Sequence, residues 1–163
     1  MKRYVKNVLI YFAALFGIIA FLSLFSSPLK IYDSTKDTWY RYQISAFLGQ
    51  NSKNFEVYKG AFVPAIGFIL PILMSVVLIV ESFKPSWSRK ITVLNTILAV
   101  VYFLCAVLVL LTKELFLDAN NLGANLYIKN GSGPIMSAIF STMSGILLLF
   151  VAWFPSEQDM DFI

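Results

Sequence analysis

The chain has 163 residues, of which 58% are hydrophobic and 13% charged, with a formal net charge of +4. Soluble domains carry about 25% charged residues, so this composition indicates a membrane protein. The chain has no histidine and a single cysteine, which excludes Ser-His-Asp, Cys-His and histidine-metal chemistry. We therefore expect a protein that is not an enzyme and has no metal and no cofactor. The small positive excess does not resemble a nucleic-acid patch, and no nucleic-acid partner is expected.

Four apolar stretches predict transmembrane helices at residues 7–29, 60–82, 91–112 and 133–154. About 20 helical residues cross a hydrocarbon core of roughly 30 Å, so each stretch is long enough. The stretches lack the alternation of a barrel strand, which favours helices. The sequence therefore predicts an all-α membrane protein, a single four-transmembrane-helix bundle over residues 1–163. Its outer loops would be 30–59 and 113–132.

Positive residues near the ends of the predicted spans set the expected orientation. They are dense before the first span and in the short loop after the second, at Lys2, Arg3, Lys6, Lys84, Arg89 and Lys90. The first outer loop also carries positive residues, but they are spread over thirty positions. The density predicts that both termini are cytoplasmic. The abundance of Lys, Asn, Ile and Phe is typical of a bacterial protein, so we expect the bacterial cytoplasmic membrane.

The first outer loop supports two interpretations. Ser34 and Asp37 resemble a capping box, and Tyr40, Ile44 and Phe47 follow at helical spacing. This pattern predicts an interfacial helix on the membrane surface.

Alternation in the same loop predicts a β-hairpin instead. Tyr40, Tyr42 and Ile44 alternate with polar residues, and the strand-like run 55–58 follows a turn at 49–52. We favour the hairpin because β-branched and aromatic residues dominate both arms. In either case the loop is expected to be partly ordered.

Aromatic residues are concentrated in this loop, which makes it a candidate partner-binding surface. The candidates are Trp39, Tyr40, Tyr42, Phe55 and Tyr58. The alternative is an aromatic cap that rests on lipid and on the outer ends of the helices.

The second and third spans contain the few intramembrane polar residues of note, Ser75, Asn95 and Thr96. Asn95 would be costly in hydrocarbon alone, so we expect it to face the bundle and to bond to a neighbouring helix. A structural role is favoured over a ligand contact. Gly67, Pro71 and Ser75 form a face with small residues, for which Gly17 and Ala13 of the first span are the expected counterpart.

The second outer loop carries Asp118, Asn120 and Asn121, oxygen-bearing side chains that suit a hard cation. The spacing of a known cation-binding loop is absent. The favoured interpretation is a helix end that satisfies its own backbone.

The fourth span has a small residue at every fourth position: Gly133, Ser137, Ser141 and Gly145. Such a stripe lets another helix approach closely. The helix that fills it is expected to be the first or second span of the same chain or, alternatively, to come from a partner subunit.

These patterns support two hypotheses of function. The first is a non-catalytic accessory, scaffold or immunity-type protein that binds another membrane protein, or itself as a homo-oligomer, through the stripe and the aromatic loop. The alternative is a small oligomeric transporter or channel for ions or small amphiphiles, with a path lined by Asn95, Thr96 and Ser141. The lipid bilayer is an expected partner in both.

Overall fold

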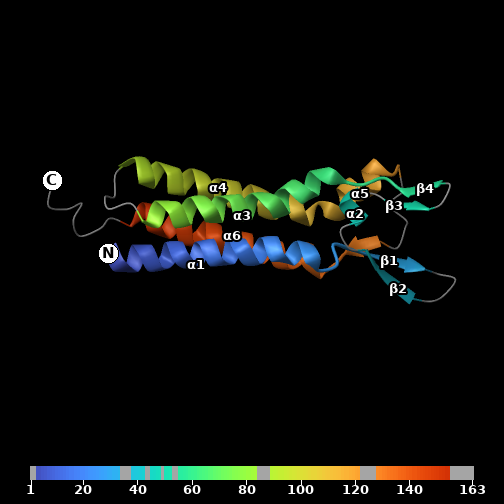
Figure 1. Cartoon of the computed structure of the whole chain (residues 1–163), viewed down its shortest axis with the longest axis horizontal. Helices are drawn as coiled ribbons and strands as arrows, with labels where there is room; N and C mark the ends of the chain where they lie inside the picture. The colour runs from blue at the N-terminus through green and yellow to red at the C-terminus, as the bar shows by residue number, and fades with distance from the viewer. Residues whose placement is uncertain are drawn as a thin grey trace.

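The computed structural model describes residues 3–33, 38–42, 45–48, 50–52, 55–83, 89–121 and 128–154. Within these ranges four helices are long and apolar enough to cross a membrane by length and composition. They are α1 (Arg3–Leu22), α3 (Phe62–Ser82), α4 (Arg89–Leu110) and α6 (Ser132–Trp153). The helices run side by side as an elongated bundle, and the start of α1 lies at the same end as the end of α6 (Figure 1).

The helices are arranged so that α1 and α4 both pack along α6, while α3 packs along α1 and, less extensively, along α4. Each helix is apolar on its outer face as well as on its buried face. On α4, Tyr102 and Val109 are fully buried, whereas Leu104 is 62% exposed and Val107 is 57% exposed. Helices that are apolar on all sides suit a lipid environment. The fold therefore suggests a membrane protein.

The first span ends earlier than the sequence predicts. The α-helix ends at Leu22, and one 3-10 turn, η1 (Ser23–Phe25), follows it. Pro28 has no N–H to continue a helix and disfavours helical geometry at Ser27. Leu29, expected at the end of the span, instead begins strand β1 (Leu29–Asp33).

The third span also ends before its predicted limit. Helix α4 stops at Leu110, and a separate helix, α5 (Thr112–Ala119), begins two residues later. The side chain of Asn130 joins the two helices. Its Nδ2 donates to the Leu110 carbonyl at 2.7 Å, and its Oδ1 accepts from the Lys113 N–H at 3.0 Å. Both ends of the break thus gain partners that a helix terminus otherwise lacks.

The end of the bundle away from the start of α1 carries a cap, called the outer cap below, built from the segments between α1 and α3 and between α4 and α6, which contain the predicted outer loops (Figure 1). A three-stranded antiparallel sheet has the order β2-β1-β5, in which β2 is Thr38–Tyr42 and β5 is Ile128–Asn130. A second hairpin pairs β3 (Gln50–Ser52) with β4 (Phe55–Tyr58). The short helix α2 (Ser45–Leu48) lies between the hairpins in sequence.

The strands of the first outer loop pair differently from the predicted hairpin. The run around Tyr40 pairs with β1, with Ile31 opposite Tyr40, and the run 55–58 pairs with β3. The stretch that would form an interfacial helix contains strand β2 instead, although Ser34 and Asp37 lie outside the described residues. The predicted arms therefore belong to two different sheets.

Candidate functional site

The small-residue stripe of α6 lies inside the bundle. All four residues are buried, and Ser137 and Ser141 are fully buried. A Cβ on Gly133 would lie 2.7 Å from the Ser23 carbonyl oxygen, and one on Gly145 would lie 2.9 Å from the Phe103 ring. Segments of the same chain thus cover the two glycines of the stripe: η1 and the turn after it at Gly133, and helix α4, the third span, at Gly145. We assign it to intramolecular packing, the first of the two interpretations above.

A polar cluster at Tyr102 joins α3 and α4 in the centre of the bundle. The Ser75 hydroxyl donates to the Pro71 carbonyl at 2.8 Å, and the Tyr102 hydroxyl donates to the same carbonyl at 3.2 Å. The two hydroxyl oxygens lie 3.1 Å apart. Because each hydroxyl has one proton, the cluster satisfies both donors with a single carbonyl and no charged group.

Gly17 of α1 packs directly against this cluster. A Cβ at this position would collide with the Ser75 and Tyr102 hydroxyl oxygens and would lie 3.0 Å from the Pro71 carbonyl oxygen. The absent side chain lets α1 approach both hydroxyls. The contact of Gly17 with Pro71 and Ser75 matches the counterpart that the sequence suggests, whereas Gly67, the third residue of that face, packs on Val109 and Cys105 of α4.

Ser144 ties α6 to α1 at the same depth. Its hydroxyl lies 2.9 Å from the Ala13 carbonyl oxygen and 3.1 Å from that of Phe140, so one donor is shared between two acceptors. Ser144 follows Ser141 on the buried face of α6 and is itself fully buried. Sequence reasoning missed Tyr102 and Ser144. A usable signal was present for Tyr102, because it lies seven residues after Asn95 and therefore on the same helix face.

Asn95 is fully buried, as the sequence predicts. The predicted bond to a neighbouring helix is not found, since neither Nδ2 nor Oδ1 has a hydrogen-bond partner among the described residues. The hydroxyls of Ser137 and Ser141 also have no partner in these ranges. The core thus contains polar side chains with unmet hydrogen-bonding capacity on both sides of the Tyr102 cluster.

Thr96 does not share this environment. Its hydroxyl donates to the Thr92 carbonyl at 3.0 Å, and its side chain lines an apolar groove of about 420 Å³ together with Ile146 and Phe150. The residues proposed for a transport path therefore divide between the core, where Asn95 and Ser141 lie, and the outer surface of α4 and α6.

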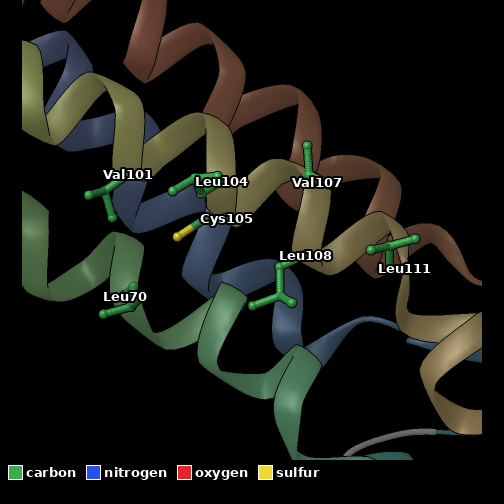
Figure 2. Close-up of a pocket in the computed structure, with 7 residues that line it drawn as sticks. All are labelled: Leu70, Val101, Leu104, Cys105, Val107, Leu108 and Leu111. Atoms are coloured by element: carbon green, nitrogen blue, oxygen red, sulfur yellow. The ribbon is translucent and has the colours of Figure 1, made fainter.

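A second apolar groove lies between α3 and α4, where their packing is less extensive. It has a volume of about 330 Å³. Figure 2 shows its lining, which comes from α4 except for Leu70 on α3 and Leu111 between α4 and α5. All lining residues are apolar, which suits contact with acyl chains, and Cys105 is a buried filler there.

The outer cap has a hydrophobic core of its own. This core consists of Leu29, Ala61, Phe116, Leu117 and Ile128, which come from both outer loops. Phe47 of α2 packs on the end of the bundle against Phe68, with ring centroids 5.6 Å apart. The cap is thus fixed both by its own core and by a contact with α3.

The side chain of Asn120, in the second outer loop, stabilises the backbone around it. Asn120 accepts from the Lys59 N–H at 2.6 Å and donates to the Lys59 carbonyl at 3.0 Å, so its carboxamide holds the chain just before α3. Asn120 also donates to the Phe116 carbonyl at 2.9 Å, which completes the end of α5. These contacts agree with the favoured interpretation of this loop. No group of metal-ligating residues is found in the part of the chain that the structure describes.

The predicted aromatic partner-binding residues lie on two hairpins of the cap. Trp39, Tyr40 and Tyr42 are in β2, which is an edge strand of the three-stranded sheet, and Phe55 and Tyr58 are in β4. The side-chain contacts of these five residues lie outside what the structure describes. Both hairpins project from the same end of the bundle (Figure 1).

Comparison with known protein families, with curated proteins and with solved structures finds no match to this chain.

Proposed function

We propose that this protein is a non-catalytic accessory protein of the membrane that binds another membrane protein, or a second copy of itself, through the hairpins of its outer cap. The observation that carries the proposal is the separate hydrophobic core of the cap, formed by residues of both outer loops. A loop that only connected two spans would not need such a core. Leu29 of this core lies in β1, which pairs with β2, so the core restrains the aromatic strand β2 and lowers the entropic cost of binding a partner.

The stripe of α6 is removed from the binding surface in this proposal, because all four of its residues are buried within the chain and its glycines pack against η1 and α4. The positive residues at the ends of α1 and α4 favour cytoplasmic termini, which would direct the cap to the extracytoplasmic side. We also propose that the protein resides in a bacterial cytoplasmic membrane, because Lys, Asn, Ile and Phe are abundant in its sequence.

Affinity purification from native membranes in mild detergent tests the proposal. We expect a co-purifying protein, or a dimer of this chain, that is lost when Trp39 and Tyr42 are changed together to alanine. The matched control is Trp153→Ala, because Trp153 is 74% exposed at the opposite end of the bundle and its loss should not affect the complex. A lone monomer in both detergent and nanodiscs, or equal loss in the control, would contradict the proposal.

A second candidate function is a small oligomeric transporter or channel. The observation that favours it is the buried, unpartnered polar character of Asn95 and Ser141. Reconstitution into liposomes tests it directly, with Asn95→Leu as the variant expected to reduce flux and Val93→Leu, at a 52% exposed position, as the control. The absence of flux of ions or small amphiphiles when dimers are demonstrably present would exclude this candidate.

A further inference from the structure

Several hydroxyls in the long helices bond to the carbonyl one turn earlier. Ser75, Thr96 and Ser144 do so at 2.8, 3.0 and 3.1 Å. This back-bonding is the usual way in which a helix satisfies a serine or threonine away from water. Ser137 and Ser141 are fully buried but do not bond in this way within the described residues, and the carboxamide of Asn95 is likewise unpartnered.

These side chains follow one another along the bundle axis. Ser137, Ser141 and Ser144 are spaced by four and three residues, which places them on one face of α6. Gly145 packs on Phe103, the residue after Tyr102 on α4. Ser144, the neighbour of Gly145, therefore lies at about the same depth in the bundle as Tyr102. Asn95 lies seven residues before Tyr102, about 10 Å further from the cap at 1.5 Å per residue.

Each unmet polar group in an apolar interior costs about 1 to 3 kcal/mol. A carboxamide has two donors and an acceptor, and a hydroxyl has a donor and an acceptor. Buried water that makes two to four hydrogen bonds is the common ligand of such groups. The unmet hydroxyls and the carboxamide are uncharged and lie in a closely packed core. Water suits them as a ligand, because it is small and uncharged and can both donate and accept hydrogen bonds.

We propose that the core of the bundle binds water at two sites, one at Ser137 and Ser141 and one at Asn95, separated by the Tyr102, Ser75 and Ser144 hydroxyls. The separating cluster is closely packed, because Gly17 leaves no space beside Tyr102 for even a methyl group. The two sites thus lie on opposite sides of a closed polar contact. This inference is independent of partner binding by the cap.

Reaction of engineered cysteines with silver ion in nanodiscs tests the proposal, because the ion is small and reaches thiols through water. Ser141→Cys and Asn95→Cys are each placed in a Cys105→Ala background. The matched control is Leu148→Cys, at a fully buried position on the same face of α6. We expect thiols at 141 and 95 to react at least about tenfold faster than at 148, since 1.4 kcal/mol of preference for water corresponds to tenfold. Reaction at both positions as slow as at 148 would overturn the proposal.

A second variant tests the water site at Asn95 even if a cysteine variant fails to fold. Asn95→Leu replaces the carboxamide by an apolar group of similar size. A dry, unmet carboxamide would make this change stabilising. If water hydrates Asn95, the unfolding temperature of this variant in detergent should not rise. A rise would overturn the proposed water site at Asn95.

Discussion

Gly17 is the position at which a single added methyl group would disturb the most contacts. Its missing Cβ is what allows α1 to meet the Ser75 and Tyr102 hydroxyls and the Pro71 carbonyl. We expect Gly17→Ala to lower the free energy of unfolding by about 1 to 3 kcal/mol, the range typical of overpacking in a close-packed core. Thermal unfolding in detergent measures the effect.

The control for this prediction is Leu15→Ala on the same helix. Leu15 is 47% exposed on the outer face of α1, so its truncation should change the free energy of unfolding much less. Equal effects of the two substitutions would show that α1 does not approach Tyr102 as described.

The shared carbonyl of Pro71 leads to a second prediction. Tyr102→Phe and Ser75→Ala each remove one of the two donors to this carbonyl. We expect each to cost about 0.5 to 1.5 kcal/mol. The double variant should cost less than the sum, because each single variant already loses the contact between the two hydroxyls and the double variant loses it only once.

A double-mutant cycle on the free energy of unfolding measures this coupling. The matched control pairs Tyr102→Phe with Thr96→Val. The Thr96 hydroxyl donates to the Thr92 carbonyl of its own helix, and its side chain lines the groove between α4 and α6, away from Tyr102. If the changes in the free energy of unfolding for Tyr102→Phe and Ser75→Ala add as strictly as those of the control pair, the two hydroxyls do not interact as described.

At the residue scale, the sequence predicts which polar groups face inward better than it predicts their partners. The burial of Asn95 and Ser75 follows from the cost of polar groups in hydrocarbon. Hydrophobicity alone does not single out Tyr102, because an aromatic residue in a span is equally suited to lipid; only its seven-residue spacing from Asn95 indicates that it faces inward. Its partners depend on Gly17 of another helix, which no pattern within α4 encodes.

At the scale of the elements, the cap depends on Asn120. This side chain holds both backbone groups of Lys59 at the entrance to α3. We expect Asn120→Ala to release this segment locally, so that the Lys59 amide exchanges with solvent about tenfold faster, as a loss of about 1.4 kcal/mol requires. Hydrogen exchange detected by mass spectrometry or NMR measures the change.

The neighbouring Asp118→Ala serves as the control for Asn120, because Asp118 is exposed on α5. The four long helices should keep their protection in both variants. A Lys59 amide that exchanges equally fast in Asn120→Ala and in the unaltered chain would contradict the proposed clamp.

The long helices could be predicted from the sequence because their length and hydrophobicity are local properties. The cap could not, since strand pairing is decided by tertiary context. Strand β1 begins at Leu29, the last residue that hydrophobicity assigns to the first span, and β5 comes from the other outer loop. The alternation around Tyr40 indicated a strand, but nothing in it identified β1 as its partner.

At the scale of the whole molecule, several polar side chains are fully buried among the apolar residues of the bundle core, whereas the outward-facing surface of the long helices is apolar. Fully buried Asn95, Ser137 and Ser141 contrast with an outer surface formed by residues such as Leu104 and Ile139. In water this arrangement would expose a large apolar area, whereas lipid solvates that area and leaves the polar groups to one another. The central claim is therefore that the bundle crosses a membrane with its cap on one side.

Labelling of single cysteines in sealed membrane vesicles with a membrane-impermeant maleimide tests this claim most directly. In a Cys105→Ala background, Asn121→Cys marks the cap and Phe154→Cys marks the end of α6, and both native residues are exposed. We predict that one of the two positions is labelled in sealed vesicles and that the other is labelled only after the vesicles are permeabilised. Labelling of both positions in sealed vesicles, with the chain retained in the membrane, would contradict a bundle that crosses it.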